Sequence, residues 1–335
     1  MSRIAIMGSG AWGTAIAISL ARRGGHEITL WSYAADVADT MRDRRENTAF
    51  LPGFRLAESI RVTDRAAEAL DGAQIVVSVT PSEFIRASFR SFAPHLNASQ
   101  LLVSATKGIE DRTYLRMSEV IDEVLAQNGL HLRCGVLSGP SFAQEVAAGA
   151  PTAITIASTD SELASRVQRE VSSNSLRLYT NDDVIGVELG GSLKNVIAIA
   201  AGIVTGLGLG YNSNAALITR GIAEITRLAI ACGGRRETLA GLSGLGDLVL
   251  TCTGSLSRNR AVGQELGKGR GLEEIIAGLG GQVAEGVRTT SAAVGLARRH
   301  GVEMPIAEQM EAILMHGKSP QRAIEELMVR PSRDE

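Results

Sequence analysis

The sequence carries little net charge. Its 34 lysines and arginines nearly balance its 36 aspartates and glutamates, which leaves a formal net charge of −2. Such a chain has no whole-molecule field that would favour a nucleic acid or an anionic membrane. We therefore expect no nucleic-acid partner, and any anionic ligand must be held by a local group of cations.

Cysteine is also scarce. Cys134, Cys232 and Cys252 lie far apart and form no CxxC pair, and the five histidines lack metal-ligand spacing. This pattern argues against a disulfide framework and a metal site, and it fits a reduced, cytoplasmic protein. No histidine shares the segment of Cys252, so we interpret it as a small core residue rather than a nucleophile. The apolar run at residues 4–7 is too short for a signal peptide.

Charged residues are absent from one long stretch, residues 195–219. Its length raises the question of a membrane helix, but three glycines and an Asn-Ser-Asn tripeptide interrupt it between residues 206 and 214. We predict a buried core helix followed by a loop, and no membrane span. Lys194 directly precedes this stretch, and an ammonium there must find a carboxylate partner, reach water or serve chemistry.

The first half alternates short apolar runs with helical segments. The runs are rich in Ile and Val and are continuous rather than alternating, which is typical of strands buried on both faces of a parallel sheet. They lie at residues 3–7, 27–31, 75–80, 101–105, 135–138 and 153–157. The helical segments between them complete βαβ units. We therefore predict an α/β fold, with a Rossmann-type, doubly wound, mostly parallel sheet in a dinucleotide-binding domain over residues 1–183.

After about residue 183 the pattern is helical, which predicts an all-α substrate-binding domain over residues 184–335. Residues 184–204 show helical spacing, and Asn214 is placed to cap a second long helix that ends at Gly233-Gly234. Further helices are expected at residues 258–266, 271–279, 287–300, 305–316 and 319–329.

Residues 8–13 read Gly-Ser-Gly-Ala-Trp-Gly, a G-x-G-x-x-G motif. The motif follows an apolar strand and opens a helical segment at residues 14–23, which is the context that dinucleotide binding requires. There Gly8, Gly10 and Gly13 would form a tight turn that lets the backbone approach a pyrophosphate at a helix N-terminus.

The second strand ends at Trp31 without the carboxylate that usually binds the ribose of NAD. Ser32 and Tyr33 stand there, and neither Asp36 nor the arginines at residues 42–45 are adjacent. Without the carboxylate, no negative charge repels the 2′-phosphate of NADP. Without an adjacent arginine, no positive charge favours NADP over NAD. We expect NADP(H) or NAD(H), with tolerance of NADPH and no strict discrimination.

Polar or glycine-rich segments follow two more of the predicted strands. Lys107 follows the strand at residues 101–105, at the edge of the sheet that lines the ligand crevice of such folds. A solvated loop lysine is the alternative. Ser141 and Gln144 follow a Gly-Pro turn with the spacing of a capping box, so either an ordinary helix cap or a ligand contact would explain them.

A third segment contains Asp247 and, after it, Arg258 and Asn259 at a predicted helix N-terminus. These residues predict a phosphate clamp, because the planar guanidinium of Arg258, the side-chain amide of Asn259 and the helix dipole all favour a phosphate. A surface arginine is the alternative. Asp247 is a candidate partner for Lys194. Such a pair would serve a structural role as well as a catalytic one.

Together these segments resemble the bacterial NAD(P)-dependent sn-glycerol-3-phosphate dehydrogenases, from Gly8 to about Gly317. The matching segments are G-S-G-A-W-G-T at 8–14, A-T-K-G-I-E at 105–110, S-G-P-S-F-A-Q-E-V at 138–146, E-L-G-G-S-L-K-N-V-I-A-I at 188–199, N-A-A-L-I-T-R-G at 214–221, G-L-G-D-L-V-L-T-C-T at 244–253, S-R-N-R at 257–260 and V-A-E-G at 283–286. Many members carry a basic residue where Ser32-Tyr33 stand here.

The resemblance implies site residues. Lys194 is the implied proton donor and acceptor. The implied substrate positions are Lys107, Gly139, Ser141, Lys194, Asp247, Ser257, Arg258 and Asn259. The implied dinucleotide contacts, beside the three loop glycines, are Ala11, Trp12, Tyr33, Lys107, Ala143, Arg258, Val283 and Glu285. The helical half is implied to resemble the C-terminal domain of 6-phosphogluconate dehydrogenase.

The implied reaction is reversible hydride transfer between NAD(P)H and dihydroxyacetone phosphate, giving sn-glycerol 3-phosphate for phospholipid synthesis in the cytoplasm. In the expected mechanism, Arg258 and Asn259 hold the phosphate while Lys194 protonates the carbonyl oxygen.

A related β-hydroxyacid or 6-phosphogluconate-type dehydrogenase is one alternative, and Ser257-Arg258-Asn259 argues against it. A catalytically silent NAD(P) sensor is another, and the lysine and clamp argue against it. The apolar helical half is compatible with a homodimer.

Overall fold

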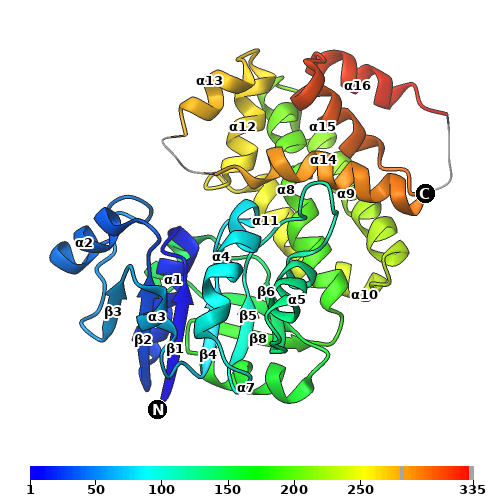
Figure 1. Cartoon of the computed structure of the whole chain (residues 1–335). Coiled ribbons are helices and arrows are strands. Elements are labelled where there is room, and N and C mark those ends of the chain that lie inside the picture. The colour runs from blue at the N-terminus through cyan, green and yellow to red at the C-terminus, as the bar shows by residue number, and fades with distance from the viewer. Residues whose placement is uncertain (280–282, 332–335) are drawn as a thin grey trace. The chain divides into compact units, whose positions relative to one another are not determined.

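The computed structural model describes residues 1–279 and 283–331 of the chain (Figure 1). They form two compact units. The first contains residues 1–107 and 115–188, and the second contains residues 108–114 and the chain from residue 189 onward. The domain boundary between residues 183 and 184 stays a prediction.

An eight-stranded sheet with the order β3-β2-β1-β4-β5-β6-β7-β8 forms the first unit. The strands are β1 Ser2–Met7, β2 His26–Trp31, β3 Ile60–Thr63, β4 Ile75–Ser78, β5 Leu101–Ser104, β6 Arg133–Ser138, β7 Thr152–Ala157 and β8 Leu176–Asn181. Neighbouring strands run parallel except β6 and β7, which are antiparallel. The doubly wound, mostly parallel sheet is confirmed, and so are the six predicted strand positions.

Two strands, β3 and β8, were not predicted. Both lie at the edges of the sheet. Exposed residues interrupt their apolar ones, such as Arg61 in β3 and Arg177 in β8. A search for continuous apolar runs finds strands buried on both faces and passes over edge strands of this kind.

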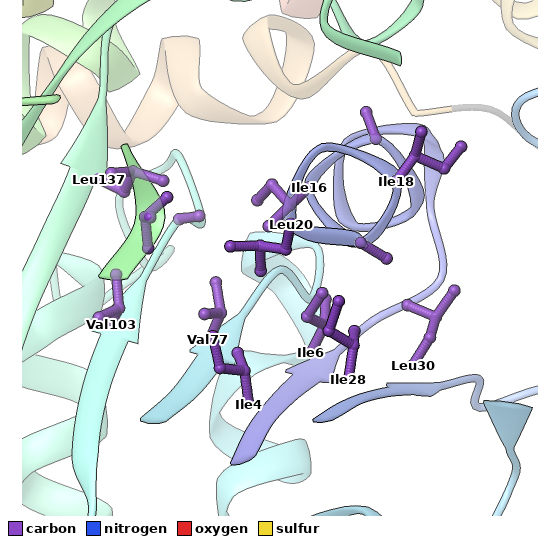
Figure 2. Packing of buried hydrophobic residues seen from close by; sticks show 14 of the residues in the cluster. Ile4, Ile6, Ile16, Ile18, Leu20, Ile28, Leu30, Val77, Val103 and Leu137 are labelled. Atoms are coloured by element: carbon purple, nitrogen blue, oxygen red, sulfur yellow. The ribbon is translucent and has the colours of Figure 1, made fainter. Parts of the chain in front are cut away.

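The helices of the first unit cover both faces of the sheet. They are α1 Ala11–Arg23, α2 Ala35–Arg44, α3 Ala66–Leu70, α4 Ile85–Phe92, α5 Met117–Gln127, α6 Ala143–Ala148 and α7 Ser161–Val171, with short 3-10 turns at Ser82–Phe84 and Ala93–His95. Because side chains alternate along a strand, Ile4 and Ile6 of β1 join the cluster under α1, while Ala5 and Met7 join the cluster on the other face. Figure 2 shows Ile16 and Leu20 of α1 on the first of these faces.

The second unit is helical among the residues that the structure describes. Its helices are α8 Val184–Gly206, which begins in the first unit, α9 Gly210–Ala231, α10 Arg236–Leu239, a π-helical turn Leu242–Gly246, α11 Asp247–Thr253, α12 Arg258–Gly267, α13 Leu272–Ala277, α14 Glu285–His300, α15 Pro305–His316 and α16 Pro320–Met328. The predicted helical second half is confirmed.

The predicted cap at Asn214 is wrong, and of the two alternatives for Ser141 and Gln144 the helix cap is not formed. Helix α9 begins at Gly210, so Asn214 lies within it, and the N-cap is Leu209 without a side-chain hydrogen bond. The left-handed backbones of Gly208 (φ +71°) and Gly210 (φ +81°) make the turn instead. Helix α6 begins at Ala143 with Phe142 as its N-cap, and Ser141 Oγ donates to the carbonyl of Gly139, 2.9 Å away.

Helix α8 is long and apolar enough to cross a membrane. However, 89% of its most apolar window is buried inside the protein. That burial is the property of a core helix, which the uncharged stretch from residue 195 onward predicted.

Candidate active site

The glycine-rich loop connects β1 to α1 and has the shape that a dinucleotide needs. Gly8 has a φ of +133°, and a Cβ at Gly13 would lie 1.9 Å from the carbonyl oxygen of Gly8. A Cβ at Gly10, in contrast, would meet nothing within 4 Å. Gly10 is the N-cap of α1 and has no side-chain cap, so the first turn leaves backbone N–H groups for an anion. These residues fit a pyrophosphate.

Asn47 supports this loop from a distant segment, and sequence reasoning missed it. Its Nδ2 donates to the carbonyl of Ser9 at 2.7 Å and to Thr14 Oγ1 at 2.8 Å, and the side chain is fully buried. Thr14 Oγ1 in turn donates to the carbonyl of Ser9 at 3.2 Å. The only sequence signal was an uncharged Asn among polar residues after α2.

The end of β2 is where a carboxylate or an arginine would select the cofactor. The Ser32 hydroxyl is buried there and accepts from Ser9 Oγ at 2.8 Å, while Tyr33 is 87% exposed. Arg42 pairs with Asp39 and Asp64. The first cation along α2 is thus engaged with acidic groups of its own neighbourhood.

The other candidates of the first unit follow the carboxyl ends of the central strands. Lys107 comes three residues after β5, and Gly139 comes directly after β6, which pairs with β5 in parallel. Gly139 has a φ of +142°, and an added Cβ would lie 2.9 Å from the Cα of Ile154. Ser141 and Ala143 continue from this turn into α6. In open α/β sheets, ligands bind outside the carboxyl ends of the strands, which is the edge where Lys107 and Gly139 lie.

Lys194 lies in the middle of α8 and is 6% exposed. Its ammonium forms an ion pair with Asp247, which is 1% exposed, and it donates to Thr251 Oγ1 at 2.8 Å. Both partners belong to α11, where Thr251 Oγ1 also donates to the carbonyl of Asp247 at 2.6 Å. The predicted pairing of Lys194 with Asp247 is confirmed. A buried pair fixes the direction of the amine.

The predicted phosphate clamp opens helix α12. Ser257 is its N-cap and accepts from the backbone N–H of Arg260 at 3.2 Å. Asn259 is buried, and its Oδ1 accepts from the backbone N–H of Gly286 at 2.9 Å. The side chain of Arg258 is exposed and makes no ion pair or hydrogen bond to the residues that the structure describes. Asn259 thus has a structural bond through its oxygen, whereas Arg258 is available to a ligand.

Glycines bring α12 close to α8. A Cβ at Gly202 would lie 2.0 Å from the carbonyl oxygen of Arg260, and one at Gly263 would lie 1.9 Å from that of Ile199. Only glycine permits backbones to approach this closely. The crossing therefore fixes the helix that carries Arg258 against the helix that carries Lys194.

Two more predicted cofactor residues lie at the start of α14. Glu285 is the first residue of this helix, and Val283 lies two residues before it. Both are half-buried.

Cys252 is fully buried in α11, and burial raises its pKa to about 12. A thiol in this state is a poor nucleophile, in agreement with the core role predicted for it. No group of three or more His, Cys, Asp or Glu side chains among the described residues could hold a metal ion.

The sequence matches two halves of one known family. The NAD-dependent glycerol-3-phosphate dehydrogenase N-terminus matches residues 3–164, and the C-terminus of the same family matches residues 183–325. The chain belongs to the NAD-dependent glycerol-3-phosphate dehydrogenase family. The resemblance predicted from its motifs is confirmed.

Relatives named glycerol-3-phosphate dehydrogenase [NAD(P)+] match the chain over its whole length. The protein from Acidobacterium capsulatum is 64% identical over 338 residues and covers 100% of both chains. That from Koribacter versatilis is 62% identical over 335 residues, 100% of this chain and 99% of its own. The crystal structure of glycerol-3-phosphate dehydrogenase from Coxiella burnetii is 41% identical, covers 98% of this chain and 99% of its own, and superposes with a TM-score of 0.93.

Proposed function

We propose that this protein catalyses reversible hydride transfer between NAD(P)H and dihydroxyacetone phosphate, giving sn-glycerol 3-phosphate. Its family and its full-length relatives support the reaction. The observation that carries the chemistry is the buried ion pair of Lys194 with Asp247. Lys194 lies on α8, and this helix crosses closely with α12, which bears Arg258. We place the reaction in the cytoplasm, where it supplies glycerophospholipid synthesis. A homodimer stays a prediction.

Reduction of a ketone needs a hydride donor and a proton donor. The reduced nicotinamide supplies the hydride when bound. Negative charge then develops on the carbonyl oxygen, where the Lys194 ammonium stabilises it and gives up one proton to form the alcohol. Asp247 and Thr251 hold the amine in a fixed direction, so little reorganisation is needed when the substrate reacts. In the reverse direction, the neutral amine accepts the proton of the alcohol.

The phosphate of the substrate needs a cation that is not already paired. Arg258 meets this need, because it is exposed and has no charged partner among the described residues, and it stands at a helix N-terminus. The proposed substrate residues are Lys107, Gly139, Ser141, Lys194, Asp247, Ser257, Arg258 and Asn259. Asn259 would act through its amide nitrogen, because its oxygen is bonded to Gly286.

The proposed dinucleotide residues are Gly8, Gly10, Ala11, Trp12, Gly13, Tyr33, Lys107, Ala143, Arg258, Val283 and Glu285. The exposed Tyr33 and the buried Ser32 present no carboxylate to a 2′-phosphate. We therefore propose that both NADH and NADPH serve. Paired KM values for the two cofactors measure the preference.

Steady-state oxidation of NADPH tests the proposed function. We expect turnover with dihydroxyacetone phosphate, and far slower turnover with dihydroxyacetone, which lacks the phosphate. Arg258→Ala removes a charged hydrogen bond and should raise the KM for dihydroxyacetone phosphate by roughly 10- to 100-fold. The control Arg322→Ala, at an exposed arginine of α16 that pairs with Glu326, should leave this KM unchanged. An unaltered KM in Arg258→Ala would contradict the clamp, and no turnover with this substrate in the unmutated protein would contradict the function.

A further inference from the structure

A short segment of the chain leaves the first unit and packs with the second. Residues 108–114 belong to the helical unit, although the residues on both sides, through Lys107 and from Leu115, belong to the unit built on the sheet. The segment therefore begins directly after Lys107, one of the proposed ligand-binding residues. We call residues 108–114 the strap.

The first residue of the strap is bound to the helix that carries Lys194. Ser192 Oγ accepts from the backbone N–H of Gly108 at 2.9 Å and donates to the carbonyl of Gly108 at 3.2 Å. Ser192 is buried and precedes Lys194 by two residues in α8. One hydroxyl thus satisfies both backbone groups of the residue next to Lys107, and this backbone is buried where no water replaces a lost bond.

The last residue of the strap is bound to α14. The ring of Tyr114 lies over Gly295, where an added Cβ would be 2.4 Å from Tyr114 Cζ. The guanidinium of Arg299, one turn further on, lies 4.9 Å from the centre of this ring, and its Nη1 donates to the carbonyl of Thr113 at 3.0 Å. Gly295 leaves the space for the ring, and Arg299 closes over it.

The backbone of the strap is strained. Arg112 has a φ of +70° and Tyr114 a φ of +60°, values that side chains other than glycine rarely adopt. Such conformations persist only when the surroundings hold them, and they gather at functional sites. The contacts of Ser192, Gly295 and Arg299 provide this hold.

We propose that the strap allows the helical unit to position Lys107, with Ser192 and Tyr114 as positioning residues. The proposal rests on the function proposed above, in which Lys107 contacts the substrate and the dinucleotide. Through the strap, the helix that carries the proposed proton donor also fixes the backbone of the second lysine. On the other side of Lys107, Thr106 Oγ1 donates to the carbonyl of Thr80 at 2.7 Å, so the strap provides the hold that follows the lysine in the chain.

The strap can be loosened without a change in any proposed ligand-binding residue. Ser192→Ala removes the hydroxyl that holds Gly108, and Gly295→Ala drives the Tyr114 ring from α14. Gly271→Ala is the matched control, because an added Cβ there meets nothing within 4 Å. Each variant is made alone and together with Lys107→Ala, and kcat/KM for dihydroxyacetone phosphate is measured with saturating NADPH.

We expect Ser192→Ala and Gly295→Ala each to lower kcat/KM by about tenfold, mainly through KM, and to have little further effect once Lys107 is alanine. Gly271→Ala should leave kcat/KM unchanged in both backgrounds.

A merely structural role would lower kcat/KM by the same factor with and without Lys107. That additivity would overturn the proposal, as would unaltered kinetics of Ser192→Ala. Unaltered kinetics of Lys107→Ala would instead contradict the proposed role of Lys107, and the positioning role with it. Should Gly295→Ala fail to fold, the cycle with Ser192→Ala decides alone.

Discussion

The buried ion pair of Lys194 and Asp247 is not explained by a contribution to the stability of the fold alone. Removing two charges from water costs several kcal/mol per ion, and their attraction repays this cost only with good geometry and further hydrogen bonds. Thr251 supplies one such bond to the ammonium. The pair is therefore weak evidence for a stabilising role. It suits an amine that must point in one direction while it exchanges a proton.

Asn47 leads to a prediction about cofactor binding. Asn47→Ala would leave the carbonyl of Ser9 and the hydroxyl of Thr14 with one partner fewer in a buried place, and the glycine loop would lose its support. We expect the Kd for NADPH, measured by quenching of protein fluorescence, to rise by roughly tenfold at a cost of about 1–3 kcal/mol in binding or stability. The exposed turn variant Asn97→Ala serves as control. Unchanged NADPH affinity in Asn47→Ala would show that the loop holds its shape without this amide.

At the residue scale, the sequence predicted those site features that a local motif or an unusual charge indicates. The glycine motif lies within six residues, and the pairing of Lys194 with Asp247 follows from a lone charge beside an uncharged run. Asn47 and Ser192 carry no such signal, because they are uncharged and each bonds a backbone carbonyl, a group that every residue has. Only the folded chain brings these groups together.

At the scale of elements, glycine contacts set how closely helices cross. Gly202 and Gly263 place the backbones of α8 and α12 in contact. The sequence predicted both helices but not their crossing, since a glycine inside a helix does not say which neighbour fills the space. The start of α9 was misplaced for a different reason, because the left-handed backbone of Gly210 makes the turn there and Asn214 lies inside the helix.

Glu224 joins two other helices through a buried carboxylate. It lies in α9, and its oxygens accept from the backbone N–H groups of Ile306 (2.9 Å) and Ala307 (3.4 Å) at the start of α15. Burial raises its pKa from 4.5 to about 7, although these two hydrogen bonds and the charge of Arg227 act against the rise. The carboxyl group is thus protonated in the folded chain at pH values where it is ionised in the unfolded chain.

This difference predicts a pH dependence of stability. Between about pH 4.5 and 7 the folded state binds more protons at Glu224 than the unfolded state, so its contribution to stability falls as pH rises through this window. The full effect is roughly 3 kcal/mol. Glu224→Gln removes the titration, so the Tm of this variant minus that of the unmutated protein should increase from pH 5 to pH 7.5. A constant difference across this range, or a decrease, would contradict the raised pKa.

At the scale of the whole molecule, the near-zero net charge agrees with a phosphate held by one local clamp. The net field of a chain with 34 basic and 36 acidic residues does not attract an anionic substrate. A local cation must therefore bind the phosphate, and Arg258 at the start of α12 is that cation in the proposed function. Fold class and family could be predicted from motifs in order along the chain. The edge strands and the passage of residues 108–114 into the helical unit could not, because they depend on packing between distant segments.

The central claim is that Lys194 transfers the proton. The most direct test is the kcat of Lys194→Ala with NADPH and saturating dihydroxyacetone phosphate, measured beside its Kd for NADPH. We predict that kcat falls by about 10²- to 10⁴-fold, the usual contribution of a general acid, while NADPH still binds. Near-normal turnover in this variant would contradict the account and leave Lys194 and Asp247 as a structural pair.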